Sequence, residues 1–251
     1  MSELLRALSD LAVPLPPGHT VLSVENPAPM LWRSDGPPTA ELVRRLRAEH
    51  PRSGLWPLLL TDQPLELFPE FMSTPDAHDA AFVLAGFWHT ITCDGSSADT
   101  TVPYGQRWPR PAPPGRQLDD PDEFAGAVLD HWFAGPPRDS RRLGLVPAPG
   151  GADALTAMGW MGAANRENDT AMLSAVLRSW EDRFGIRVLH LDSDTVTVSV
   201  AAPPDDLDAA LHLAAEHFAF CPDTLWQGHP HTIGDYAPLL LEARVWSFWW
   251  D

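Results

Sequence analysis

The chain contains no lysine, because all 17 of its basic residues are arginine. A P-loop grips nucleotide phosphates with a lysine, and enzymes that work through a Schiff base use a lysine amine. Both classes of chemistry are therefore excluded. The missing lysine, the 27 prolines and the many alanines are together typical of a protein encoded in a GC-rich genome.

Cysteine and long apolar runs are also scarce. The two cysteines, Cys93 and Cys221, cannot make a disulfide framework, so a reducing cytoplasm is the expected compartment. No apolar run reaches the roughly 18 residues of a membrane-spanning helix. The first residues, MSELLRALSDLAVPLPP, lack the basic and then apolar pattern of a signal peptide.

Positive charge is outweighed by negative charge, with a formal net charge of −17. This balance disfavours nucleic acids and anionic membrane surfaces as partners, because both present negative charge. It suits a basic protein partner, whose complementary charge would speed the encounter, although solubility alone is an alternative explanation. With 251 residues, 44% of them hydrophobic, the chain can form one large globular domain or two small ones.

The N-terminal part has a mixed pattern of helices and strands. We expect a short helix capped by Ser2, a strand at 19–25, a helix at 39–50, a buried strand at 55–60, a helix at 75–91 capped by Asp76 and a helix at 119–133. The stretch from Cys93 to Gln117 is rich in proline, glycine and small polar residues, which predicts a long loop or linker. A second such break at 134–142 predicts a boundary between an N-terminal α/β region, 1–140, and a C-terminal domain, 143–251.

The C-terminal part has clearer signals. A helix at 168–185 is expected, with Asn168 or Asp169 as its cap and Gly185 at its end. A hairpin of strands at 186–191 and 195–201 follows, and alternation of valine with threonine and serine predicts one buried and one solvated face. Further helices are expected at about 205–221 and from Thr232, before a tryptophan-rich strand. The predicted fold is α+β, with helices packed on a small mixed or antiparallel sheet.

Four segments of this part, GLVPAPGGADALTAMGW, NDTAMLSAVLRSWEDRFG, AEHFAFCPDTLWQG and WSFWWD, resemble the bacterial domain-of-unknown-function family 4253. The resemblance covers about residues 143 to 251 and implies a compact intracellular bacterial domain with no established reaction. The GLWPLLL segment resembles the region that often precedes this domain in actinobacterial relatives. The family pattern falls on Trp180, Gly185, Glu216, Cys221, Pro222, Asp223, Gln227, Trp246, Trp249, Trp250 and Asp251.

Residues 212–223, HLAAEHFAFCPD, are similar to a helical zinc motif but have the wrong spacing. His212 and His217 are five residues apart, which places them roughly 140° apart on a helix rather than on one face. An apolar stripe predicts the core face of this helix and comprises Leu207, Leu211, Ala214, Phe218 and Cys221. His212 and Glu216 are then expected to point into solvent as a surface pair, with His217 at the margin of the stripe.

The remaining polar residues of this stretch have two possible roles. Cys221 lies at a helix C-terminus, where the dipole raises the pKa of a thiol, so we expect a buried structural cysteine. Asp223 and Gln227 either cap the next turn and satisfy backbone groups or line a polar pocket near Trp226, Trp249 and Asp251. The consecutive Trp249 and Trp250 must point to opposite sides of a strand. An open sheet face would leave aromatic surface there for a ligand or partner, whereas the N-terminal region is the alternative cover.

Two functional hypotheses follow. The first is a non-enzymatic protein-binding domain, similar to the immunity or accessory proteins of bacterial conflict systems. The alternative is a hydrolase or metal-dependent enzyme that uses Glu216, His217, Cys221, Asp223 and the loop residues His229 and His231. The predicted pocket or interface comprises Glu216, His217, Cys221, Asp223, Trp226, Gln227, Trp246, Trp249 and Asp251. No cofactor is predicted, and the sequence does not determine the oligomeric state.

Overall fold

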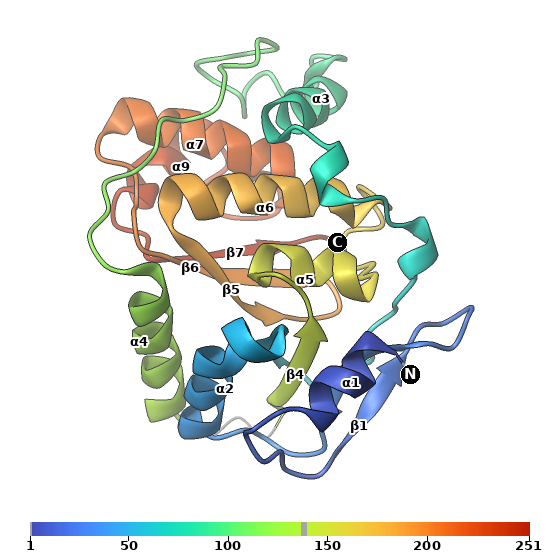
Figure 1. Ribbon diagram of the computed structural model, residues 1–251. Coiled ribbons are helices and arrows are strands. Elements are labelled where there is room, and N and C mark those ends of the chain that lie inside the picture. Colours follow the sequence, from blue (N-terminus) through green and yellow to red (C-terminus); the bar gives the residue numbers. More distant parts are fainter. Residues whose placement is uncertain (1, 137–139) are drawn as a thin grey trace.

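A computed structural model describes residues 2–136 and 140–251, and over these residues one mixed sheet of seven strands carries helices on both faces (Figure 1). The strands are β1 (Gly18–Leu22), β2 (Pro29–Ser34), β3 (Leu55–Leu60), β4 (Arg142–Pro147), β5 (Ile186–Leu191), β6 (Thr195–Val200) and β7 (Val245–Trp249). The helices are α1 (Glu3–Ser9), α2 (Ala40–Ser53), α3 (Ala80–Thr92), α4 (Pro121–Ala134), α5 (Gly151–Met158), α6 (Thr170–Phe184), α7 (Leu207–Phe220), α8 (Asp223–Trp226) and α9 (Ile233–Leu240). The predicted α+β class is confirmed.

The sheet joins the two regions that the sequence suggests. Its order is β1-β2-β4-β3-β5-β6-β7, so β4 from the C-terminal part lies between β2 and β3 from the N-terminal part. The pairing of β3 with β5 is parallel, and the other strand pairs are antiparallel. The N-terminal region therefore completes the sheet of the C-terminal part. The predicted boundary at 134–142 includes residues 137–139, which lie outside the described ranges.

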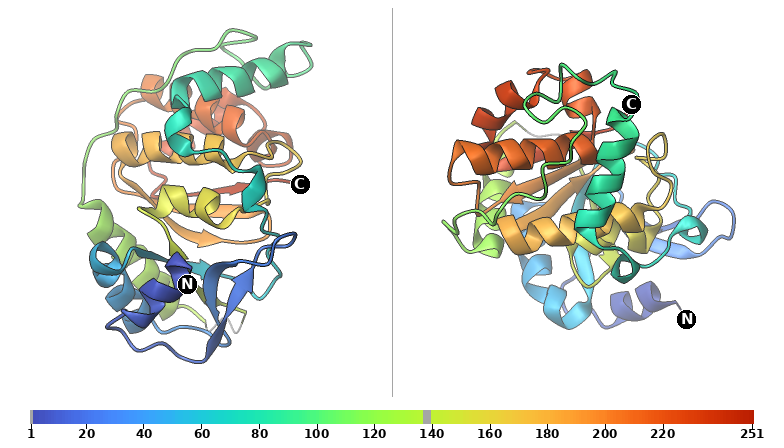
Figure 2. Two further views of the ribbon diagram at one scale, coloured as in Figure 1. Left: turned by 45° about the vertical axis from the view of Figure 1, so that its right-hand side comes forward. Right: turned by 90° about the horizontal axis from the view of Figure 1, so that it is seen from above.

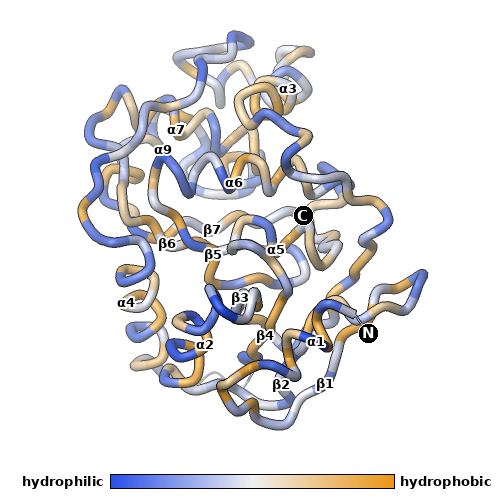
Figure 3. The backbone as a smooth tube through the Cα atoms, in the orientation of Figure 1, coloured by the Kyte–Doolittle hydropathy of each residue, from blue (hydrophilic) through white to orange (hydrophobic). Residues whose placement is uncertain are grey.

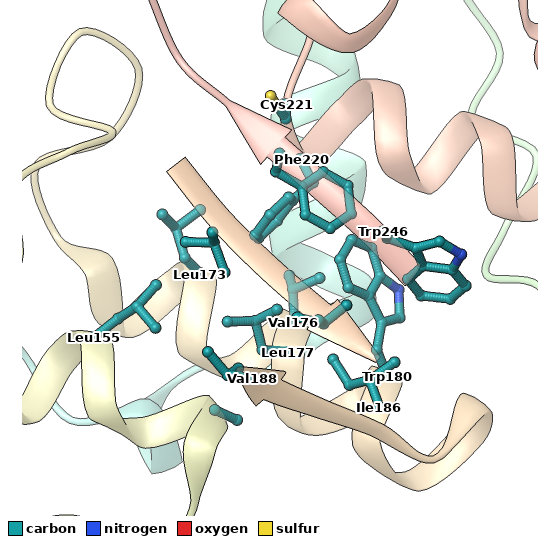
Figure 4. Close-up of a cluster of buried hydrophobic side chains, with 14 of the residues drawn as sticks. Leu155, Leu173, Val176, Leu177, Trp180, Ile186, Val188, Phe220, Cys221 and Trp246 are labelled. Atoms are coloured by element: carbon teal, nitrogen blue, oxygen red, sulfur yellow. The ribbon is translucent and has the colours of Figure 1, made fainter. Parts of the chain in front are cut away.

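Helices cover both faces of this sheet (Figure 2). Helices α5 and α6 pack on one face, with α3, α7 and α9 beside and above them, and helices α1, α2 and α4 pack on the other. Figure 4 shows part of the first core, where side chains of α5 and α6 meet β5, β7 and the end of α7; they include Leu155, Leu173, Val176, Leu177, Trp180, Ile186, Val188, Phe220 and Trp246. Burial of this apolar surface is the main contribution to stability.

Strand β6 corrects one expectation. Its alternating sequence predicted a solvated face, but Thr197 is only 9% exposed and Ser199 is fully buried. The prediction was wrong because α4 packs on that side of β5 and β6. Strand β7, at the edge of the sheet, does alternate: Trp246 and Phe248 are buried, whereas Trp249 is 40% exposed.

Local capping signals explain where most of the helices begin and end. Asp169 accepts the N–H of Ala171 at the start of α6, and Gly185 ends that helix at φ 57°, a left-handed conformation that favours glycine. Helix α9 begins next to Thr232, as predicted, and the Thr232 side chain caps it. Asp76 does not cap α3: Asp79 accepts the N–H of Phe82, because residues 75–77 form a separate 3₁₀ turn.

The segment from Cys93 to Asp120 contains turns but no helix or strand, and it runs across α7 and α6 before reaching α4 (Figure 1). Much of it is polar (Figure 3), yet Ala112 is only 3% exposed. The N–H of Gly115 donates to the carbonyl of Arg183 at 2.9 Å, and a side chain at Gly115 would collide with the carbonyl of Ala202. We call residues 93–120 the strap, since they lie along the outer side of these helices.

None of the helices formed by the described residues is both long enough and apolar enough to cross a bilayer.

Candidate functional site

Glu216 lies in the protein interior and not in solvent. The Arg183 guanidinium donates to both carboxylate oxygens of Glu216, with Nη1 2.8 Å from Oε1 and Nη2 2.6 Å from Oε2. Trp180 Nε1 donates to Oε2 at 2.8 Å, and the N–H of Ala112 donates to Oε1 at 2.6 Å. The expected surface position was wrong because the strap covers the outer side of α7, which a helical wheel cannot show. The four donors make Glu216 the anchor between α6, α7 and the strap.

The predicted core stripe of α7 is only partly correct. Phe218 and Cys221 are fully buried, but Leu207 is 49% exposed near the start of the helix. His212 is half-buried, and its Nδ1 lies 3.1 Å from the carbonyl oxygen of Arg110 in the strap. His212 and Glu216 therefore make separate contacts with the strap rather than a surface pair.

His217 is a neutral histidine of the core. It is fully buried, its Nδ1 lies 3.0 Å from the Tyr236 hydroxyl, and its ring packs against Trp180, Trp246 and Phe248. Burial, with a smaller contribution from the positive charge of Arg183, lowers the pKa of His217 to about 3. A histidine with this pKa carries no charge near neutral pH.

Cys221 has the surroundings of a structural thiol. Its Sγ lies 2.9 Å from the carbonyl oxygen of Trp249, and burial raises the pKa of the thiol to about 11. A nucleophilic cysteine needs the opposite shift. Asp223 accepts hydrogen bonds from Gln227 Nε2 at 3.0 Å and from the N–H of Asp251 at 3.4 Å, so it joins α8 to the chain end.

The nine predicted site residues do not form one cavity. Glu216, His217, Cys221 and Trp246 are at most 2% exposed, whereas Trp226, Gln227, Trp249 and Asp251 lie at the surface and Asp223 is intermediate. The rings of His229 and His231 are 4.3 Å apart in an exposed loop. Within residues 2–136 and 140–251, no group of three or more histidine, cysteine, aspartate or glutamate side chains is arranged to hold a metal ion.

A cleft of about 610 Å³ lies elsewhere, where α2, α4 and α6 meet the turn before α5. We call it the α5 cleft. The charged and titratable side chains that line it are those of Arg47, His50, Asp122, Glu181, Asp182 and Arg187. They come from α2, α4, α6 and β5, so both the N-terminal and the C-terminal parts build the cleft.

Two arginines in the α5 cleft share one carboxylate. Arg187 binds Asp122 with Nε and Nη2, each at 3.0 Å, and Arg47 Nη2 binds Asp122 Oδ1 at 3.0 Å. The Arg47 side chain is 10% exposed, and its guanidinium carbon lies 4.9 Å from the centre of the Trp56 ring. Arg47 Nη1 is buried without a hydrogen-bond partner among the described residues. Asp122 is therefore shared by two cations, while Glu181 and Asp182 also line the cleft.

Glu181, on α6, contacts the start of α5. Its Oε1 accepts the N–H of Ala152 at 3.3 Å, while the helix cap, Gly150, supplies no side chain. A side chain at Gly151 would approach the Trp56 ring to 2.8 Å, so glycine lets α5 begin directly against the indole. Burial raises the pKa of Glu181 to about 7, although the charge of Arg187 opposes the shift. This carboxyl group therefore exchanges its proton near neutral pH.

The α5 cleft combines features that are common in ligand sites. The start of a helix offers N–H groups and a favourable dipole to an anion, and guanidinium groups bind carboxylate and phosphate groups. A carboxyl group with a strongly shifted pKa in a cleft is a further marker of such sites. The cleft was not predictable from the sequence because its residues lie far apart in the chain. The glycine pair in PAPGGAD, between β4 and α5, was the one local signal.

Comparison with known proteins gives a family for the C-terminal part. No curated protein and no solved structure matches the chain. The family model "Domain of unknown function (DUF4253)" matches residues 142–251. This range contains Glu181, Arg187 and the turn before α5, whereas Arg47, His50 and Asp122 precede it. The C-terminal part of the chain therefore matches the DUF4253 family model, which confirms the resemblance seen in its sequence.

Proposed function

We propose that this protein binds a small molecule with an anionic group in the α5 cleft. The observation that carries the proposal is the position of Arg47 and Arg187, which share Asp122 beside the start of α5. Glu181 and Asp182 also line the cleft, so the attraction for an anion comes from the two guanidinium groups and not from the net charge of the cleft.

The geometry also favours a ligand over a purely structural role for these arginines. Asp122 is exposed and accepts bonds from both guanidinium groups, which leaves several of their N–H donors for another acceptor. Guanidinium groups bind carboxylates and phosphates through paired hydrogen bonds. The volume of the cleft, about 610 Å³, lies within the range of small-molecule sites.

Binding of simple anions tests this proposal. We expect sulfate, inorganic phosphate or malonate at ~10 mM to raise the melting temperature of the protein in a low-salt buffer, because a ligand of the folded state stabilises it. The Arg187→Gln and Arg47→Gln variants should bind the same anion about tenfold more weakly, since each loses a charged hydrogen-bonding group. Titration calorimetry at pH 6 would give the affinities.

A matched control is Arg45→Gln, which removes the same charge from an exposed position of α2. It should bind like the wild type. Circular dichroism would show that the Arg47 and Arg187 variants are folded. If no anion binds the wild type, or if all three variants bind equally well, the proposal is wrong.

A second function, binding to a basic protein, is favoured by a separate observation. Trp226 is 48% exposed on α8 and Trp249 is 40% exposed on β7, and these two elements pack together in an acidic chain. Exposed tryptophans often form the centre of protein interfaces. We expect immobilised wild type to retain a partner that the Trp226→Ala/Trp249→Ala variant loses, with the affinity then measured on the purified partner. Equal retention by both proteins would contradict this function.

The Glu216 region lends less support to a hydrolase. Both carboxylate oxygens of Glu216 are occupied, His217 is neutral, and the pKa of Cys221 is about 11. All three side chains are inaccessible to a substrate. Their contacts support a role in holding α6, α7 and β7 together.

A further inference from the structure

Glu181 occupies the position that a bound anion would use. Its Oε1 accepts the N–H of Ala152. This N–H is one of those at the start of α5 that have no acceptor within the helix itself. The same carboxyl group lines the α5 cleft together with Arg47 and Arg187. A charged Glu181 therefore competes with a ligand anion, while a protonated Glu181 offers it a hydrogen-bond donor.

We propose that an oxyanion, such as a phosphoryl, sulfuryl or carboxylate group, binds in the α5 cleft together with one proton, which Glu181 takes up. This inference rests on the proposed function, since it concerns the ligand of the same cleft. It assigns Glu181 a specific role: the residue lets the cleft accept an anion and couples the affinity of the protein for that anion to pH.

The charges around Glu181 support this coupling. On its own helix the neighbour is Asp182, and from α5 it faces Asp153, whose charge is already paired with Arg178. From β5 it faces Arg187 and from α2 it faces Arg47, and both cations favour its charged form. The other charged or titratable groups of the cleft are His50 on α2 and Asp122 on α4.

A bound anion favours the protonated form of Glu181. Two negative charges that share a poorly solvated site cannot both persist, so the carboxyl group becomes protonated. Burial already brings the pKa of Glu181 to about 7 in the free protein, so little further shift is needed near neutral pH. The anion then pairs with the arginine side chains, and the neutral carboxyl group can donate a hydrogen bond to a ligand oxygen.

This coupling has a quantitative consequence. If only the protonated form binds, affinity follows the fraction of protein in which Glu181 carries a proton. For a pKa of about 7, affinity should fall about tenfold between pH 6 and pH 8. Proton uptake should approach one per bound anion at pH 8 and fall towards zero at pH 5.5.

Calorimetry with sulfate provides the test, because sulfate remains a dianion throughout this range. Titrations at each pH in two buffers of different ionisation enthalpy give both the affinity and the number of protons taken up. The wild type should show the tenfold fall and the proton uptake. The Glu181→Gln variant, whose neutral amide can still donate to the anion, should bind sulfate with an affinity that does not change with pH and without proton uptake.

His50 provides the necessary control, because it is the histidine that lines the same cleft. The His50→Gln variant should keep the proton uptake of the wild type. Sulfate binding without uptake in the wild type, or uptake that persists in Glu181→Gln, would overturn the role of Glu181 while leaving the proposed function intact. If neither the wild type nor Glu181→Gln binds sulfate at any pH, the proposed function itself fails and this inference fails with it.

Discussion

The Glu216→Ala variant is expected to lose about 3–5 kcal/mol of unfolding free energy, which is the typical cost of breaking a buried ion pair by removing one partner. The side chain of Glu216 is fully buried, and its removal leaves the Arg183 guanidinium, which is 14% exposed, without its carboxylate. Trp180 Nε1 and the N–H of Ala112 also lose their acceptor. Buried donors without partners add their own desolvation cost. Urea unfolding at pH 7 would measure the loss.

The strap should respond as well, because Glu216 is the buried anchor for Ala112. We expect trypsin to cleave the folded Glu216→Ala variant at Arg107 or Arg116 much faster than the wild type. Glu242→Ala, which removes an exposed glutamate, is the matched control and should stay within about 0.5 kcal/mol of the wild type. A loss below about 1 kcal/mol in Glu216→Ala, with unchanged cleavage of the strap, would show that the anchor contributes little.

Replacing both Arg183 and Glu216 separates the cost of an unpaired charge from the cost of lost packing. A double variant with methionine at positions 183 and 216 removes both buried charges and keeps apolar volume. Such replacements are often neutral or stabilising relative to the intact pair. If the double variant is much more stable than Glu216→Ala, the cost in the single variant comes from the unpaired Arg183 and not from the lost volume.

Elements with strong local signals were predictable from the sequence. The apolar run at 55–60 and the segment 186–191 were assigned as strands with the bounds that the structure has for β3 and β5. Each begins directly after a glycine, Gly54 or Gly185, and both glycines have positive φ. Local chemistry is sufficient for such elements, because turn residues and side-chain periodicity act over a few positions.

The position of Glu216 was not predictable in the same way. A helical wheel compares residues within one helix and assumes that the polar side faces water. The strap, more than 90 residues earlier in the chain, covers that side of α7. The same limit applies to the α5 cleft, because Arg47, Asp122, Glu181 and Arg187 meet only after β3 pairs with β5. Long-range pairing decides both sites, and one sequence carries little information about it.

We also expect His217 to make the unfolding free energy of the protein fall strongly in acid. Burial lowers the pKa of this histidine to about 3, whereas in the unfolded chain it is about 6.5. A base whose pKa is depressed by folding contributes stability above pH 6.5, and that contribution is lost as the pH falls towards 3. Between pH 6.5 and pH 4, the unfolded chain gains a proton that the folded protein cannot accept. His217 alone should therefore cost the wild type about 2–3 kcal/mol over this range.

The His217→Gln variant lacks a titratable group at this position, so it should lose this part of the pH dependence. We expect it to be less stable than the wild type at pH 7, because the ring contacts with Trp180 and Trp246 and the bond to Tyr236 are disturbed. The difference between the two proteins should then shrink by about 2–3 kcal/mol as the pH falls from 6.5 to 4. Urea unfolding at four or five pH values would measure this change.

Other groups also titrate in this pH range, so the contribution of His217 is obtained from the difference in unfolding free energy between the two proteins. Glu181 acts in the opposite direction: its pKa is raised from 4.5 to about 7, so its contribution to stability is complete below pH 4.5 and is lost as the pH rises through 7. Glu181 is present in both proteins and cancels in the difference. His229→Gln, which replaces an exposed histidine, should run parallel to the wild type at every pH. A His217→Gln profile that also runs parallel would mean that His217 accepts a proton in the folded protein and that its aromatic surroundings tolerate the charge.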